Sequence, residues 1–169
     1  MKEVAELLNT MCESGIITNY ALFGALAQTR YTEPAMTIDA DVLVTVPSTE
    51  RLDILSSIYK FCAGRGYRAE GEAIQVGAWP VQFVPVFSPL TQEALDHADT
   101  ADFEGVPLRV VRANYLAVIA LSVGRARDLT RILSLLESCS VTREDISQLA
   151  AKHQLSEAWI KFEKRFLND

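Results

Sequence analysis

The sequence is poor in the residues on which several classes of protein depend. It has three cysteines among 169 residues, Cys12, Cys62 and Cys139, which are far apart and form no Cys-x-x-Cys pair. Their number and spacing argue against a disulfide framework and against a zinc site. The two histidines, His97 and His153, have no cysteine or histidine at ligand spacing, so we expect both to be solvated rather than to bind a metal.

Long apolar runs and several common motifs are absent as well. No run approaches the roughly 18 apolar residues that a membrane-spanning helix requires, and the N-terminus is too acidic for a signal peptide. The sequence has no P-loop, no Gly-x-Gly-x-x-Gly and no Gly-x-Ser-x-Gly motif, which leaves dinucleotide-binding and hydrolase functions without support. We therefore expect a cytoplasmic protein with no membrane partner.

The chain is acidic, with 16 Lys and Arg against 22 Asp and Glu and a net charge of −6. Such a surface does not as a whole attract nucleic acid nonspecifically. One stretch is nevertheless basic, because Asp128 is the single acid among five arginines: Arg109, Arg112, Arg125, Arg127 and Arg131. Either these arginines lie on a solvated helix face, or they gather at a phosphate-binding site.

Helix and strand patterns alternate over the first two thirds of the chain. Apolar spacing predicts helices at residues 4–11, 25–31, 52–62 and 90–98, and strands at 16–23, 37–46, 67–76, 81–85 and 106–111, the last an edge strand because of Pro107. Beyond residue 111 it predicts helices alone, at 115–123, 128–136, 142–149 and 156–167. We therefore predict an α/β (α+β) core, a small mixed sheet flanked by helices, in residues 1–111, and a helical part, residues 112–169, packed on that core.

The strongest strand pattern, residues 37–46, contains two carboxylates in an otherwise apolar run. Asp39 and Asp41 are two residues apart, so in a strand their side chains point to the same face. Two charges on one face need compensation: either they lie at a solvated strand end, or they converge on a cation. Mg²⁺ prefers hard oxygen ligands and commonly uses one or two protein carboxylates together with the phosphates of a substrate.

A glycine junction precedes this strand. The residues Tyr20-Ala-Leu-Phe23 predict a strand that runs into Gly24, where glycine permits a positive φ or a close approach of the backbone. Backbone N–H groups at such a junction are suited to hold a phosphate tail. A tight turn without a ligand is the alternative.

These features together resemble a known family. Phe23-Gly-Ala25 followed by Thr37-Ile-Asp-Ala-Asp41 is similar to the first motif of the nucleotidyltransferase superfamily with the DNA polymerase β-like palm. Within it, the sequence looks closest to the bacterial abortive-infection type II toxin nucleotidyltransferases. Tyr115-Leu116, followed by Gly124-Arg-Ala-Arg-Asp128 and Arg131-Ile-Leu133, resembles their helix-borne Arg-x-Lys-Asp element. The order and spacing of these motifs match over residues 20–136.

The resemblance implies roles for individual residues. It implies nucleotide contacts by Gly24, Ala25, Gln82, Arg125 and Arg127, Mg²⁺ binding by Asp39 and Asp41, and catalysis by Asp39, Asp41 and Asp128. The alternative for Asp128 is a charge that complements the N-terminus of a helix, with the arginines around it as its partners.

Some positions depart from the family pattern. The second glycine or serine usual after Gly24 is Ala25, a lysine expected in the helix at 115–123 aligns with Ala120, and the strand that brings a third carboxylate carries Gln82. A neutral amide is a poorer metal ligand than a carboxylate and is no general base. Gln82 therefore disfavours a two-metal reaction and is compatible with nucleotide binding through one metal; a surface strand position is its alternative.

Two functions follow as hypotheses. The first is a nucleotidyltransferase that binds a nucleoside triphosphate with Mg²⁺ and transfers a nucleotidyl group to a hydroxyl of an RNA, a protein or a small molecule. The second is a catalytically degenerate protein of the same fold, acting as a binding or regulatory partner in a toxin–antitoxin or defence system, with an antitoxin or a second copy of itself as partner. A structural domain without a ligand is a third alternative.

Overall fold

The computed structural model describes residues 1–33, 37, 39–47 and 54–167. Its helices are α1 (Lys2–Glu13), α2 (Gly24–Gln28), α3 (Ile54–Gly64), α4 (Pro89–Asp96), α5 (Ala113–Val123), α6 (Ala126–Glu137), α7 (Arg143–Lys152) and α8 (Ser156–Phe166). Its strands are β1 (Asn19–Phe23), β2 (Ala40–Thr45), β3 (Arg68–Glu70), β4 (Ala73–Val76), β5 (Trp79–Pro85), β6 (Asp99–Phe103) and β7 (Val106–Val110).

All these strands form one mixed sheet in the order β3-β4-β5-β2-β1-β7-β6. The pairs β2–β5 and β1–β7 are parallel, and the other neighbours are antiparallel. The most apolar strand pattern of the sequence thus occupies the centre of the sheet, where Val42, Leu43 and Val44 of β2 are completely buried. The predicted α/β class with a mixed sheet is confirmed.

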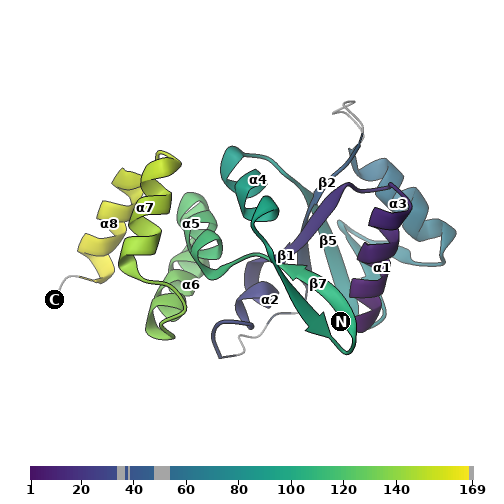
Figure 1. Ribbon diagram of the computed structural model, residues 1–169, viewed down its shortest axis with the longest axis horizontal. Coiled ribbons are helices and arrows are strands. Elements are labelled where there is room, and N and C mark those ends of the chain that lie inside the picture. Colours follow the sequence, from purple (N-terminus) through teal and green to yellow (C-terminus); the bar gives the residue numbers. More distant parts are fainter. Residues whose placement is uncertain (34–36, 38, 48–53, 168–169) are drawn as a thin grey trace.

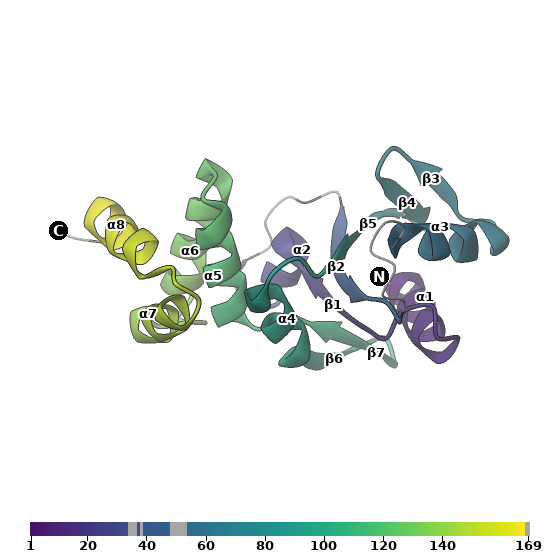
Figure 2. The same cartoon turned by 90° about the horizontal axis from the view of Figure 1, so that it is seen from above.

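The molecule is elongated, with the sheet and the C-terminal helices at opposite ends (Figure 1). Helices α1 and α3 lie on the side of the sheet away from the C-terminal helices, and α2 and α4 lie between the sheet and those helices (Figures 1 and 2). Both α2 and α4 contact α5. None of the described helices has the length and apolar character that a membrane span needs.

The element in which the two carboxylates were predicted is shorter than expected. Strand β2 begins at Ala40, so Asp41 is its second residue and Asp39 directly precedes it. Ile38 lies outside the described residues, as do residues 48–53, which contain the start of the helix predicted at 52–62. From Ile54 onward that helix is present as α3.

The prediction of one strand over residues 67–76 is wrong. This segment is a hairpin, in which β3 pairs antiparallel with β4. Between them Gly71 has a φ of +63°, a left-handed conformation that reverses the chain at no steric cost to glycine. The sequence carries a signal for this turn, because Gly71 stands between Glu70 and Glu72 in the middle of the segment.

The prediction of an edge strand at residues 106–111 is wrong as well. Strand β7 lies between β1 and β6, and the edge on this side of the sheet is β6, which the sequence did not predict. Pro107, which has no N–H to donate, is tolerated because β1 and β7 pair at the far end of the strand, where Leu22 is opposite Val110. The carbonyl of Pro107 instead accepts a hydrogen bond from the side chain of Asn9 at 2.8 Å.

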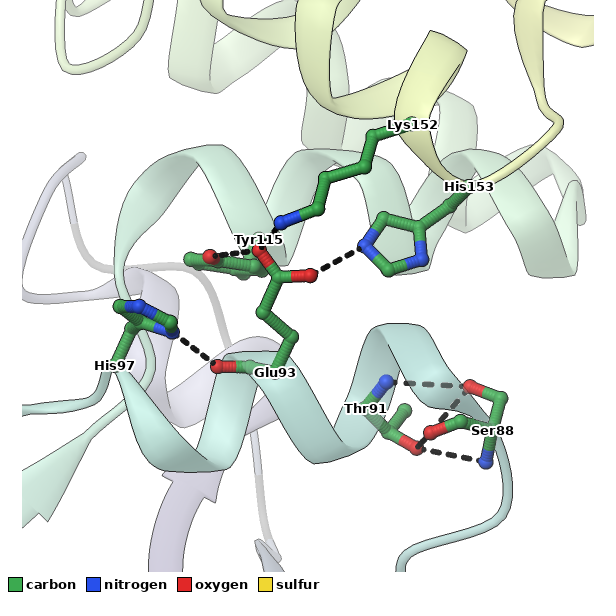
Figure 3. A network of polar contacts seen from close by, with 7 residues as sticks. All are labelled: Ser88, Thr91, Glu93, His97, Tyr115, Lys152 and His153. Atoms are coloured by element: carbon green, nitrogen blue, oxygen red, sulfur yellow. Dashed lines mark hydrogen bonds and ion pairs between the residues drawn. The ribbon is translucent and has the colours of Figure 1, made fainter.

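A cluster of polar side chains joins the sheet end of the molecule to the helical end (Figure 3). Glu93 on α4 accepts hydrogen bonds from Tyr115 Oη on α5 at 2.9 Å and from Lys152 Nζ on α7 at 2.6 Å. Its other oxygen lies 2.9 Å from His153 Nε2. The side chain of His153 is 10% exposed, so the expectation that it is solvated is wrong, whereas His97 is exposed and stacks on Tyr115.

Candidate functional site

Three neighbouring strands set the predicted site residues in one row. In the register of the sheet, Phe23 of β1 is opposite Asp41 of β2, and Asp41 is opposite Gln82 of β5. Gly24 follows Phe23 directly and begins α2. The sheet therefore brings together Gly24, Asp41 and Gln82, which are far apart in the sequence.

Gly24 is required at its position for two reasons. Its φ is +71°, in the left-handed region that side chains rarely adopt. In addition, a Cβ atom at this residue would collide with Oδ2 of Asp41. The close approach of α2 to the carboxylate thus depends on the absence of a side chain.

A cavity of about 780 Å³ opens beside this row. The sheet, the residue before β2 and α2 contribute Gly24, Ala25, Gln28, Asp39, Asp41 and Gln82 to its lining. Helix α5 contributes Leu116, Ile119, Ala120 and Val123, and α6 with its preceding residue contributes Arg125, Arg127, Asp128, Thr130, Arg131 and Ser134. Every site residue that the sequence predicted therefore borders the same cavity. Its volume lies in the range of pockets that enclose small-molecule ligands.

The carboxylates of Asp39 and Asp41 have no ionic partner among the described residues. Asp39 accepts a hydrogen bond from Thr37 Oγ1 at 3.3 Å, and the Asp41 carboxylate forms neither a hydrogen bond nor an ion pair in this part of the chain. Burial, followed by repulsion from Asp39, raises the pKa of Asp41. A cation between them would relieve both effects.

The opposite wall of the cavity is basic. Arg127 and Arg131 line it from one face of α6, because residues four apart lie one above the other on a helix. Arg125 joins them from the residue before the helix. The three guanidinium groups lower the pKa of Asp41 across the cavity, against the effect of burial.

Asp128 holds two of these arginines. Its carboxylate is 1% exposed and forms ion pairs with Arg125 Nε at 2.7 Å and Arg131 Nη1 at 3.5 Å. It also accepts a hydrogen bond from the backbone N–H of Arg125 at 3.3 Å, which caps α6. The structure thus contains the arrangement that the alternative for Asp128 predicts, a helix-terminal charge with arginine partners.

The other two arginines of the basic stretch are not at the site. Arg109 binds the Asn19 side chain and donates to the carbonyl of Leu95 at 3.0 Å, near the end of α4. Arg112 forms an ion pair with Asp99 at 2.8 Å. Both are structural, so three of the five arginines of the basic stretch line the cavity and the other two hold the sheet and its neighbouring helix together.

Several polar residues that line the cavity had no role predicted from the sequence, among them Arg131 and Gln28. Arg131 belongs to the basic stretch and to the element that carries the resemblance, and its spacing of four from Arg127 on a predicted helix was a usable signal for a role in the site. Gln28 gave no signal at all, because a glutamine in a short helix is ordinary. Its burial depends on α5 and α6, which are far along the chain.

Comparison with solved structures supports the fold independently of the sequence patterns. No protein-family model matches the sequence, and neither does any curated protein. The solution structure of the antibiotic-resistance factor ANT(2'')-Ia is similar over 98% of this chain and 99% of that one, with a TM-score of 0.53 at 14% identity. An antigenic nucleotidyltransferase-like protein from Paracoccidioides brasiliensis is similar over 98% of this chain and 97% of that one, with a TM-score of 0.55 at 14% identity.

The chain therefore has a nucleotidyltransferase-like fold. The predicted palm-like architecture is confirmed by this similarity, which at such low identity concerns the fold alone. The closer resemblance to abortive-infection type II toxins and the boundary at residue 111 stay predictions.

In this nucleotidyltransferase-like fold, the donors at the cavity suit a hard cation. Carboxylate oxygens are the ligands that Mg²⁺ prefers, and one or two of them suffice where phosphates complete the coordination. Within residues 1–33, 37, 39–47 and 54–167, no group of three Asp, Glu, His or Cys residues gathers as a metal site. Asp39 and Asp41 are thus a pair without a third carboxylate, because Gln82 occupies the position beside Asp41.

Proposed function

We propose that this protein binds a nucleoside triphosphate together with Mg²⁺ and transfers a nucleotidyl group to a hydroxyl of an RNA, a protein or a small molecule. One observation carries the proposal: the carboxylates of Asp39 and Asp41, which have no ionic partner among the described residues, line one cavity together with three arginines. A triphosphate with its metal ion presents the complementary charges. The nucleotidyltransferase-like fold adds to this support.

Each wall of the cavity has its own part in this proposal. Asp39 and Asp41 would hold Mg²⁺, which neutralises charge on phosphate oxygens when it is bound. Arg125, Arg127 and Arg131 would bind the phosphate oxygens, since guanidinium groups form strong charge-assisted hydrogen bonds with them. Gly24 lets the phosphates approach the backbone of α2, beside Ala25.

Asp128 would support transfer indirectly. Its two ion pairs fix the directions of Arg125 and Arg131, and a buried carboxylate so engaged is suited to position guanidinium groups rather than to contact the phosphates. We expect Asp128→Asn to impair transfer more than it impairs triphosphate binding, because orientation of the arginines matters most in the transition state.

Calorimetric titration tests the proposal directly. The wild-type protein should release or absorb heat with at least one nonhydrolysable nucleoside triphosphate in the presence of Mg²⁺, and Asp39→Asn should abolish the signal. Asp96→Asn, on the exposed surface of α4, is the control and should bind like the wild type. The absence of heat with all four triphosphates, for a protein shown by circular dichroism to be folded, would reject the proposal.

Gln82 favours a second candidate function. The register places its amide beside Asp41, where a third carboxylate would lie, and an amide is no general base. A protein that binds the nucleotide without transferring it, and acts as a regulatory partner of an antitoxin or of its own second copy, fits this arrangement. Incorporation of labelled nucleotide into any acceptor by the wild-type protein would exclude this candidate.

A further inference from the structure

One polar side chain in the cavity has no part in the function proposed above. Gln28, the last residue of α2, lines the cavity and is 5% exposed. The other buried polar or charged residues in the described part of the chain are Thr91 and Asp128. Both of those have their hydrogen bonds within the protein, Thr91 in a capping box and Asp128 with its arginines.

The carboxamide of Gln28 differs from them, because it has no hydrogen-bond partner among the described residues. Its backbone carbonyl accepts a hydrogen bond from the N–H of Tyr31 at 2.8 Å, which leaves the side chain uninvolved. In the same part of the chain no fully buried side-chain nitrogen or oxygen lacks a partner. The amide atoms of Gln28 are therefore not fully buried, and because the residue lines the cavity, its donor and acceptor, which have no partner among the described residues, are available to a ligand there.

The surroundings of Gln28 combine apolar and polar surfaces. Helix α2 contacts both α5 and α6. From α5, Leu116, Ile119 and Ala120 form an apolar wall of the cavity, and from α6, Ser134 adds a hydroxyl. Such a wall suits the face of a flat ring, whereas the polar groups suit its edge.

The chemistry of a carboxamide selects among the parts of a nucleotide. Its oxygen accepts and its nitrogen donates, side by side in one plane. A phosphate group offers acceptors alone and would leave the amide oxygen unpaired, whereas the edge of a nucleobase offers an adjacent donor and acceptor that pair with both. Gln28 lies four residues after Gly24, about 6 Å along the helix axis, which a nucleoside with its phosphates at Asp41 can span.

We propose that Gln28 determines nucleotide specificity by hydrogen-bonding the edge of the nucleobase, whose ring lies against the apolar wall of α5. This inference rests on the proposed triphosphate binding. It adds that the protein recognises the nucleobase, and that Gln28 is the residue that does so. Gln28 is then a binding residue with no role in the chemical step.

Titration of Gln28→Met separates this inference from the proposed function. The variant keeps the length of the side chain and removes both hydrogen-bonding groups. We would measure the affinities of the wild type and the variant for Mg²⁺ complexes of tripolyphosphate and of nonhydrolysable ATP, GTP, CTP and UTP analogues. The wild type should prefer one base over the weakest by about 10-fold or more, the discrimination that a good pair of hydrogen bonds gives, and the variant should lose this preference while binding tripolyphosphate unchanged.

Each other outcome has one meaning. Equal wild-type affinities for all four analogues, or a preference that survives in Gln28→Met, would overturn the assignment of Gln28 and leave triphosphate binding intact. Failure of the wild type to bind tripolyphosphate or any analogue would instead overturn the proposed function. Gln148→Met on the exposed face of α7 is the matched control, and Gln28→Asn, which keeps the amide on a shorter side chain and should weaken the same preference, replaces Gln28→Met if that variant does not fold.

Discussion

The carboxylate of Asp41 lies against Gly24, so closely that a Cβ atom on residue 24 would collide with its Oδ2. The contact joins the end of β1 to the start of β2 and fixes where α2 begins. It predicts that Gly24→Ala displaces the Asp41 carboxylate and reduces Mg²⁺–triphosphate affinity by about 10-fold or more, since a small displacement of a metal ligand costs at least about 1.4 kcal/mol. Calorimetric titration measures this loss.

Gly15→Ala is the matched control for Gly24→Ala. Gly15 has a φ of +68°, nearly that of Gly24, but a Cβ atom there would meet no atom within 4 Å. Both variants should lose about 1 kcal/mol of unfolding free energy to the strained backbone, and Gly15→Ala should bind the triphosphate like the wild type. Equal losses of affinity in the two variants would show that backbone strain, not the contact with Asp41, matters for binding.

Asp41 should reduce the stability of the protein in the absence of metal. Its pKa is raised by burial and by the Asp39 carboxylate, so its ionised form is unfavourable in the folded state at neutral pH. We expect Asp41→Asn to unfold at a higher temperature than the wild type in EDTA, while it loses the stabilisation that Mg²⁺ and triphosphate give the wild type. Differential scanning calorimetry with and without these ligands measures both effects; a lower melting temperature in EDTA would contradict the prediction.

Gln82 limits the number of cations at the site. With two carboxylates available, we expect one Mn²⁺ to bind per wild-type chain in the presence of a nonhydrolysable triphosphate, counted by electron paramagnetic resonance. Gln82→Asp adds a third carboxylate beside Asp41 and should raise the count to two. Gln75→Asp on β4, which is not part of the cavity lining, is the control, and two ions in the wild type would show that a third carboxylate is not needed.

Local patterns predicted the parts of the fold that depend on local forces. The strand ending at Gly24 and the helices after residue 111 follow from apolar spacing and from glycine, which act within a few residues. Strand β6 was missed because Asp99-Thr-Ala-Asp-Phe103 has little apolar character. It forms through pairing with β7 across a turn at Glu104 and Gly105, both with positive φ. Because such pairing depends on both segments, the sequence of β6 alone does not predict it.

In the candidate site as well, local sequence predicted some features, whereas others depend on distant segments. The spacing of Asp39 and Asp41 indicated a shared face, and the resemblance supplied a ligand for them. That Gln82 is next to Asp41 was implied by the resemblance alone, because the sequence of neither strand by itself determines how two distant strands align. The burial of Gln28 depends on helices that begin more than eighty residues later, so its free carboxamide was not predictable from its own neighbourhood.

The polar cluster around Glu93, formed with Tyr115, Lys152 and His153, should make the stability of the protein depend on pH in the acid range. Hydrogen bonds from Lys152, and then those from Tyr115 and His153, lower the pKa of Glu93 from its ordinary value of 4.5 to about 2. A carboxyl whose pKa is lower in the folded state stabilises the protein above its unfolded pKa and loses this effect as the pH falls. The contribution of Glu93 should therefore be complete at pH 6 and decline between pH 4.5 and about 2.

Glu93→Gln tests this assignment, because the amide keeps the size of the side chain and cannot ionise. At pH 6 we expect the variant to lose about 2 kcal/mol of unfolding free energy, the scale of hydrogen bonds to a charged group, and we expect the loss to shrink at pH 3. Urea unfolding followed by circular dichroism measures both values. Glu144→Gln, an exposed carboxyl on α7 that binds Gln148 alone among the described residues, should follow the wild type throughout. Tyr115, which donates to Glu93, directly precedes Leu116 of the cavity wall, so Glu93→Gln should also weaken triphosphate binding. An unchanged affinity would show that the polar cluster around Glu93 stabilises the helices without shaping the cavity.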